Sequence, residues 1–300
     1  MWLALAFLST FFLGCYDISK KKSVHNNAVI PVLFFNTLFC TLLFSPFFLL
    51  SQLNPSFIGD SIFYVPTVTL NTHFFIILKS VLVLSSWLFG YFAIKHLPLT
   101  ITGPINATRP VMTLMGALLI FGERLNMYQW IGVLLTILSV FLLSATGKKE
   151  GINFRHNKWV IFMFLAAILG AASGLYDKYL MQAYSSTAVQ FWYNLYQFVL
   201  MSVLLLVLWY PRRKKSTPFK WKWNILLVSL FLTIADFVYF YALTDPDAMI
   251  SIVSMVRRGS VVISFAGGVL FFHEKNLKGK LIDLVLIIIG MFFLYLGTKP

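Results

Sequence analysis

Long apolar runs follow one another along almost the whole chain, and they restrict its fold more than any other feature. Each run has about 20 residues, the length an α-helix needs to cross the hydrocarbon layer of a bilayer. Only helices or a closed barrel can span that layer, because lipid cannot hydrogen-bond to the backbone, and barrel strands are about half as long. Hydrophobic residues make up 59% of the chain and charged residues 11%. The sequence therefore predicts an all-α integral membrane protein.

The apolar runs predict ten transmembrane helices joined mostly by short loops. Their expected ranges are Met1–Ser19, Ala28–Gln52, Thr72–Ile94, Pro98–Phe121, Met127–Thr146, Lys158–Met181, Thr187–Tyr210, Trp221–Leu243, Ala248–Phe272 and Leu277–Leu296. The longest connection, Leu53 to Asn71, is rich in Asn, Pro, Ser and Thr. We expect a polar loop there, folded against one face of the membrane.

Short motifs in the first half of the chain recur in the same order in the second half. Gly14 to Asp17 matches Gly174 to Asp177, Asn36 matches Asn194, Tyr91 to Ala93 resembles Phe240 to Ala242, Pro98 matches Pro246, and Phe121 to Arg124 matches Phe272 to Lys275. We interpret the chain as two five-helix repeats, residues 1–146 and 158–300, joined by a linker at 147–157. Because five is odd, the second repeat enters the membrane from the opposite face. Such inverted repeats are typical of secondary transporters, whose substrate site lies at mid-membrane between the repeats.

Specific motifs also resemble those of a known family. Gly122-Glu123-Arg124 follows the fourth helix and precedes Gln129 to Gly132. Tyr91 to Lys95 comes before that proline-containing helix, and Glu274-Lys275 ends the ninth. In these features the chain resembles the drug/metabolite transporter superfamily, in particular its EamA-type branch of ten-helix carriers. It departs from the pattern at His273. The resemblance implies a transporter fold over nearly the whole chain but indicates little about the substrate.

Charge indicates how the chain lies in a membrane. The net charge of +14 comes mainly from Lys and Arg in short loops beside apolar runs, a pattern of membrane topology that argues against nucleic-acid binding. These residues concentrate in alternate loops, those after the first, third, fifth, seventh and ninth helices. The positive-inside rule places those loops in the cytoplasm and both termini outside. The resemblance implies cytoplasmic termini instead. In either orientation we expect a multi-pass protein of the inner, cytoplasmic membrane.

Ionisable residues near mid-membrane are candidate substrate ligands, because charge within the bilayer is costly. Arg109 lies about twelve residues, or roughly 18 Å, into the fourth helix, and Arg257 and Arg258 lie at similar depth in the ninth. Asp236 is midway along the eighth helix. Arginine suits bidentate recognition of a carboxylate or phosphate. The structural alternative is that Arg257 or Arg258 pairs with Asp236, and that Arg109 pairs with Asp17 or Asp177.

Asp17 and Asp177 occupy matching places in the two repeats and are candidates for proton coupling. A carboxylate in a medium of low dielectric constant can titrate near neutral pH. The alternative is a purely interfacial role, in which Asp17 pairs with Lys20 and Asp177 with Lys178. Asp283, near the start of the tenth helix, is expected at the membrane interface.

Four further residues are candidates for the walls of the site. Trp192 and Tyr239 lie on helices expected to flank the cavity, although most aromatic side chains in such a protein face lipid or form interfacial belts. Asn36 and Asn194 are buried amides at matching places in the repeats. They either contact substrate or hold helices together.

These features favour a secondary transporter that exports amino acids or related small metabolites by alternating access, without a cofactor. Its partners are then a small-molecule substrate, protons and the lipid bilayer, and it is a monomer or homodimer. The runner-up is a carrier of anionic or phosphorylated organic solutes, and a lipid-linked or drug-like cargo comes third. A membrane-embedded enzyme is disfavoured because the five histidines are scattered without metal-site spacing. A non-transporting membrane subunit is disfavoured only by the inverted repeat.

Overall fold

A computed structural model describes residues 2–59, 61–109, 111–113, 126–148, 152, 154, 156–245, 253, 256–272 and 277–297. The described residues form helices and turns and contain no strand. The helices are α1 Trp2–Val24, α2 Val29–Leu53, α3 Pro55–Ile58, α4 Leu70–His96, α5 Leu99–Ala107, α7 Met127–Lys148, α8 Lys158–Ala183, α9 Ser186–Leu204, α10 Asn224–Leu243, α12 Ser260–Phe272 and α13 Leu277–Leu296, with a π-helical turn Leu205–Trp209 and a 3₁₀ turn Tyr210–Arg212 after α9. Pro110, Pro246, His273 and the motifs Gly122-Glu123-Arg124 and Glu274-Lys275 lie outside the described residues.

Six of the described helical segments are long and apolar enough to cross a membrane. They contain α1, α2, α4, α8, α9 and α10. Local capping starts two of them, since Thr69 accepts a hydrogen bond from the backbone of Thr72 and Asn157 accepts one from Trp159. Asn26 turns the chain between α1 and α2 with a left-handed φ of 51°. The prediction of an all-α membrane protein is confirmed.

Contacts at the helix ends show that the halves run in opposite directions. Lys21, near the end of α1, donates to Ile94 and Leu97, near the end of α4. His96, the last residue of α4, stacks on Trp159 at the start of α8, with ring centroids 3.6 Å apart. The second half therefore begins at the end of the bundle where α1 finishes, as an inverted repeat requires.

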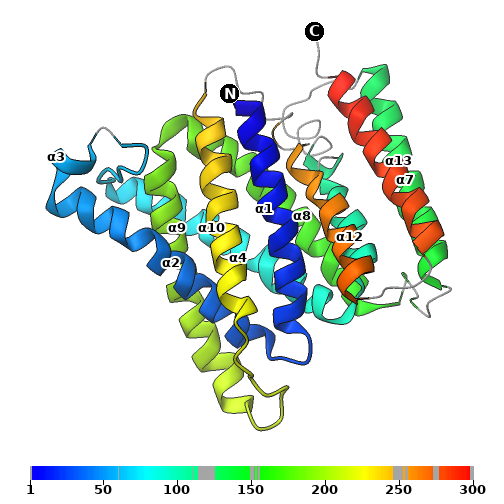
Figure 1. Ribbon diagram of the computed structural model, residues 1–300, viewed down its shortest axis with the longest axis horizontal. Coiled ribbons are helices and arrows are strands. Elements are labelled where there is room, and N and C mark those ends of the chain that lie inside the picture. Colours follow the sequence, from blue (N-terminus) through cyan, green and yellow to red (C-terminus); the bar gives the residue numbers. More distant parts are fainter. Residues whose placement is uncertain are drawn as a thin grey trace.

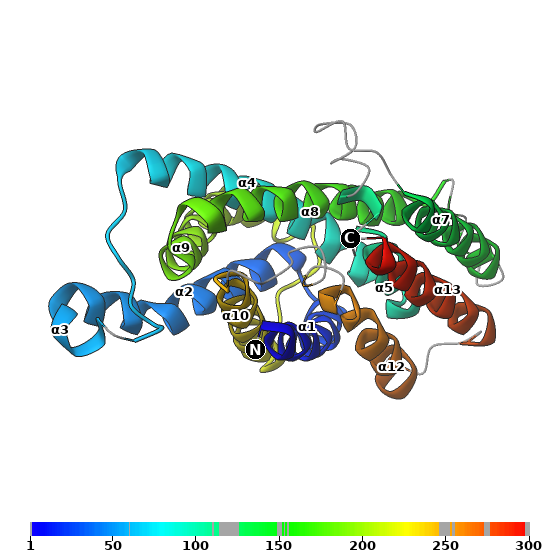
Figure 2. The same cartoon turned by 90° about the horizontal axis from the view of Figure 1, so that it is seen from above.

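Helix packing follows the same pseudo-two-fold pattern (Figures 1 and 2). The helices α2 and α9 pack together, as do α5 with α12 and α7 with α13, and each of these pairs joins equivalent members of the two halves. The other two large contacts are related to each other by the same symmetry. α1 packs on α10, and their equivalents in the other repeat, α8 and α4, also pack together. The two halves thus interlock, and any site between them draws residues from both.

The α2–α4 connection packs into one end of the bundle. Phe63 stacks between Phe47 and Phe237, at centroid distances of 4.6 and 4.9 Å. Val65 is fully buried, and Thr187 at the start of α9 donates to the carbonyl of Tyr64 over 2.6 Å. The loop therefore contacts the helices through apolar side chains as well as through its polar backbone.

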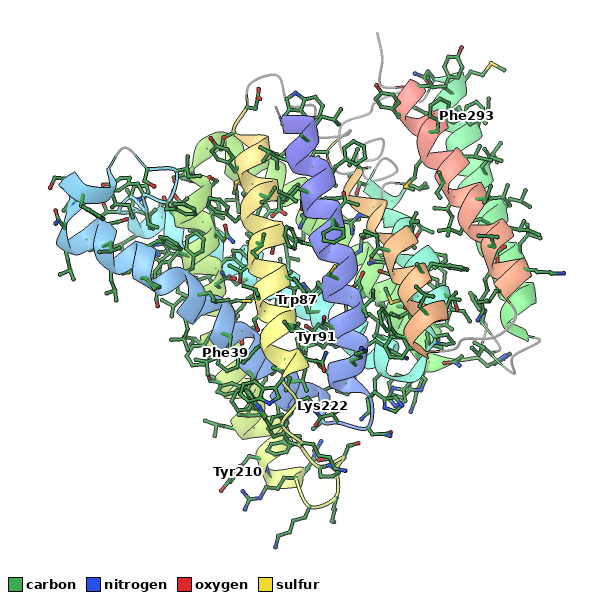
Figure 3. All side chains as sticks on the ribbon, viewed as in Figure 1. Phe39, Trp87, Tyr91, Tyr210, Lys222 and Phe293 are labelled. Atoms are coloured by element: carbon green, nitrogen blue, oxygen red, sulfur yellow. The ribbon has the colours of Figure 1, made fainter. Side chains whose placement is uncertain are left out.

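Basic residues gather at the opposite end. Lys222 donates to the carbonyls of Lys22 and His25, which joins the α9–α10 loop to the α1–α2 turn. Lys95 donates to Thr217 in the same region. Figure 3 shows Lys222 and Tyr210 together at this lower end, far from the start of α1. The predicted alternation of basic loops thus corresponds to one basic end of the molecule.

Candidate functional site

The three candidate arginines lie at interruptions in two equivalent helices. α5 ends at Ala107, Thr108 forms a turn, and helical structure resumes at Arg109. In the second repeat, Arg257 and Arg258 end a helical turn, and Gly259 separates this turn from α12. Arg109 and Arg257 stand at the same spacing after Pro98 and Pro246. Broken helices at matching places in two repeats are typical of transporter binding sites.

The break at Gly259 is stabilised by α1. The Gly259 N–H bonds to the carbonyl of Val256 at 2.9 Å, and the Thr10 hydroxyl donates to the same carbonyl at 2.8 Å. A side chain at position 259 would approach that carbonyl to 2.9 Å and Thr10 to 3.5 Å. A side chain at position 259 would therefore crowd the Val256 carbonyl, which is the group that Thr10 of α1 satisfies.

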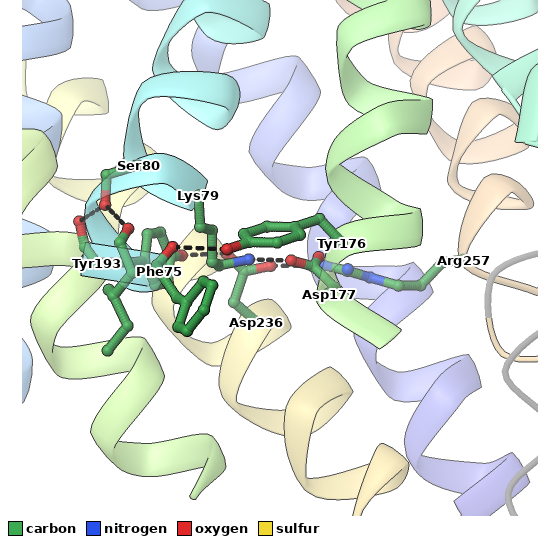
Figure 4. Close-up of polar contacts among 9 residues, drawn as sticks. Phe75, Lys79, Ser80, Tyr176, Asp177, Tyr193, Asp236 and Arg257 are labelled. Atoms are coloured by element: carbon green, nitrogen blue, oxygen red, sulfur yellow. Dashed lines mark hydrogen bonds and ion pairs between the residues drawn. The ribbon is translucent and has the colours of Figure 1, made fainter. Parts of the chain in front are cut away.

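Asp236 connects α10 to the arginines (Figure 4). Its Oδ1 accepts a 2.5 Å hydrogen bond from Nη2 of Arg257, and its Oδ2 accepts one of 2.8 Å from the hydroxyl of Tyr193 on α9. The Arg257 guanidinium also lies over the ring of Tyr239, 3.8 Å from its centroid. The pairing of Arg257 with Asp236 is confirmed, and Tyr239 contacts Arg257, whereas contact of Tyr239 with a substrate stays a prediction.

A second ion pair joins Lys79 of α4 to Asp177 of α8 (Figure 4). The Lys79 ammonium also lies 5.0 Å from the ring centroid of Tyr193, whose hydroxyl binds Asp236. The sequence did not predict this partner for Asp177; no ion pair between Asp177 and Arg109 is recorded among the described residues, and the Lys178 side chain lies outside them. Lys79 is near the start of its helix and Asp177 near the end of an antiparallel one, so the two lie at the same depth. The inverted topology could have predicted that Lys79 and Asp177 lie at the same depth.

Asp17 pairs with Lys20 within α1 at 2.6 Å, as predicted for an interfacial role. It also accepts a 3.1 Å hydrogen bond from Ser264 of α12. Nearby, the hydroxyls of Tyr16 and Tyr91 are 3.3 Å apart, and Tyr91 is the α4 counterpart of Phe240. Whether Asp17 and Asp177 couple transport to protons stays a prediction.

Arg109 and Arg258 have no carboxylate within ion-pair distance among the described residues. Nη2 of Arg109 donates to the carbonyl of Ala166 on α8 at 3.3 Å, and Nε of each arginine is buried without a hydrogen-bond partner among the described residues. Asp17 attracts both guanidinium groups electrostatically, and Arg257 repels both.

The repeat explains why Arg109 lacks the partner that Arg257 has. Tyr91 to Ala93 corresponds to Phe240 to Ala242, which places Trp87 of α4 at the equivalent of Asp236. The indole of Trp87 cannot neutralise a guanidinium. Among the described residues, Arg109 therefore has no carboxylate partner equivalent to the one that Arg257 has.

For the other predicted wall residues, no contact with the arginines is recorded among the described residues. Trp192 packs against His73 at 4.5 Å and Phe48 at 5.5 Å, beside the apolar cluster that contains Tyr193 and Tyr239. Asn36 is fully buried and accepts a 3.1 Å hydrogen bond from Ser229, so it joins α2 to α10. Asn194 is buried on α9. The helix-joining alternative describes Asn36 better than substrate contact does.

One carboxyl group on α13 is buried within the protein. Asp283 is 1% exposed, and neither of its oxygens has a hydrogen-bond partner among the described residues. Its position in the sequence gives its distance from the helix start but not the face that α13 turns inward, and its place at the membrane interface stays a prediction.

The comparisons with known proteins agree with this architecture. A profile of the EamA-like transporter family matches residues 1–145 and 157–296. Two segments of one family, arranged as inverted halves around buried charges, define a polytopic membrane transporter. The chain belongs to the EamA-like transporter family.

A solved structure titled "Crystal structure of protein" has the same fold. It superposes with a TM-score of 0.66 at 14% sequence identity, over 98% of this chain and 96% of that one. At this identity the likeness concerns the fold alone. A search of curated proteins finds no match.

Proposed function

We propose that this chain is a secondary transporter of small organic solutes that carry an anionic group, and that it works by alternating access between its two repeats, 1–146 and 158–300. Amino acids and related metabolites are the first candidates, since each carries a carboxylate. Export is the direction that the family resemblance implies. The basic end of the molecule faces the cytoplasm in this proposal, and the membrane is the inner one.

The observation that carries the proposal is a pair of arginines, Arg109 and Arg258, for which the described part of the chain supplies no carboxylate partner. Two guanidinium groups in the membrane interior are costly unless an anion neutralises them. They come from equivalent broken helices of opposite repeats, so an anion held between them contacts both halves. Rocking of one half against the other would then expose that anion to each side in turn.

Phosphorylated solutes are the second candidate. Arg109, Arg257 and Arg258 interact electrostatically with one another, so a single ligand group could meet more than one of them. A phosphate dianion has the charge and the number of acceptor oxygens to use several guanidinium groups together. A single carboxylate leaves more of that positive charge without a counter-ion.

A ligand screen tests the proposal. Detergent-purified wild type and Arg109→Ala are heated with amino acids, organic acids and sugar phosphates. A ligand present at 100 times its Kd adds about 2.7 kcal/mol to the free energy of unfolding. We expect an anionic solute to raise the Tm of the wild type and not that of Arg109→Ala. Stabilisation only by uncharged or apolar compounds would refute the anionic site.

A further inference from the structure

The Arg257–Asp236 pair uses only half of the binding capacity of its guanidinium. Nε–H and one N–H of Nη2 lie along the same edge of the planar group, and together they form the fork that grips a carboxylate or phosphate with two hydrogen bonds. Asp236 takes Nη2 at 2.5 Å, whereas Nε is buried and has no partner among the described residues. A ligand that fills this edge with two oxygens competes with Oδ1 of Asp236 for Nη2.

Displacement would leave Asp236 in an unfavourable state. Asp236 is 9% exposed, and a buried carboxylate that loses its counter-ion costs several kcal/mol. The groups around it offer little replacement charge, since Lys79 is already paired with Asp177. The titratable and charged groups that act on Asp236 are Arg257, Tyr193, Asp177, Cys40, Tyr16 and Tyr239. Among the described residues, Arg257 is the cation recorded in an ion pair with Asp236, Lys79 lies 5.0 Å from the ring of Tyr193 but is paired with Asp177, and Asp177 adds repulsion.

We infer that binding of an anionic group on Arg257 draws one proton from solution onto Asp236. The anion forms two hydrogen bonds, to Nε–H and Nη2–H, while the bond from Nη2 to Oδ1 breaks. Oδ1 then takes the proton, and Oδ2 keeps its bond from Tyr193. Charge balances for a monovalent anion, because one negative and one positive charge enter together. This inference rests on the proposed function and adds its coupling ion and the residue that carries it.

The inference has a consequence for direction. Movement of a monovalent anion together with one proton is electroneutral, so the solute and proton concentration gradients decide where net flow goes. When the outward concentration gradient of the metabolite exceeds the inward proton gradient, net flow is outward and each anion leaves with a proton. The proposed export of anionic products is compatible with this coupling.

Proton uptake on anion binding tests the inference. Sulfate is the probe, because it stays fully ionised between pH 5 and 8 and its four oxygens can engage a guanidinium fork. Its binding to the detergent-purified full chain is measured by thermal shift. Proton uptake is measured with an indicator dye in weakly buffered solution at matched starting pH. We expect one proton taken up per sulfate bound, and an apparent Kd that rises up to about tenfold per pH unit.

Variants assign the proton to its site. Asp236→Asn should bind sulfate with no proton uptake and with a Kd independent of pH, whereas Asp236→Glu should keep the uptake. Loss of uptake in Asp17→Asn but not in Asp236→Asn would overturn the assignment. The wild-type measurement decides even if Asp236→Asn fails to fold, since sulfate binding without uptake overturns the inference and leaves the proposed function standing. No sulfate binding at any pH would overturn both.

Discussion

Gly170 of α8 gives a way to move Arg109 without removing its charge. A Cβ built at Gly170 overlaps the guanidinium of Arg109, and its distance to Nε is 2.8 Å. Ordinary contacts between such atoms begin near 3.5 Å, so Gly170→Ala displaces the guanidinium by about 1 Å. The displaced group is the flexible end of a long side chain, so the fold should accommodate the methyl group. Alanine in a helix interior is also more favourable than glycine by about 0.5–1 kcal/mol.

The expected loss is functional. Charge-assisted hydrogen bonds contribute about 1.5–3 kcal/mol, so misplacing Arg109 should weaken binding of an anionic solute roughly 10- to 150-fold. The assay is the dissociation constant of the solute found in the thermal-shift screen, measured with purified protein, alongside the Tm without ligand. We expect an unchanged or higher ligand-free Tm with a weakened Kd.

Gly174→Ala is the matched control. Gly174 lies one turn further along α8, and a Cβ there meets nothing within 4 Å. Its Kd should equal that of the wild type. If Gly170→Ala binds the solute as tightly as Gly174→Ala does, Arg109 has no part in the site and the reasoning is refuted.

Two further predictions concern the buried ion pair and the orientation. Lys79→Met leaves Asp177 unpaired and should lower the free energy of unfolding, measured by chemical denaturation, by about 3–5 kcal/mol. The double variant Lys79→Met with Asp177→Asn should recover most of that loss. If the single and the double variant are equally destabilised, the result argues against the pair. In a cysteine-free background, Ser216→Cys at the basic end should react with an impermeant maleimide only in inside-out vesicles, and Ser56→Cys in the α2–α4 connection only in right-side-out ones. The reverse pattern would place the termini in the cytoplasm.

Sequence patterns predicted the elements of this fold better than their contacts. Apolar run length gave the positions of the helices because the bilayer sets one length for all of them. Arg109, Arg257 and Arg258 stood out because charge is rare at that depth. The Arg257–Asp236 pair was foreseen as an alternative because both residues lie at mid-depth on successive helices.

What the sequence missed depends on which way each helix face turns. Asp177 is next to Lys178 in the chain, yet it bonds to Lys79, which the sequence does not bring near it. Gly170 contacts Arg109, and this contact depends on the docking of α5 against α8, which sequence patterns do not show. Side-chain depth can be counted from a helix end, but rotation about the helix axis is set by packing between distant segments.

Counterflow in proteoliposomes tests the central claim most directly. Vesicles containing wild-type protein are loaded with the unlabelled anionic solute from the screen and diluted into a trace of the labelled one. The account predicts transient uptake of label above that of protein-free vesicles, and strong loss of this uptake in Arg109→Gln and Arg258→Gln proteins that keep the wild-type elution profile. Uptake that both substitutions leave unchanged, or the absence of counterflow with wild type for every anionic solute that raises its Tm, would contradict the account.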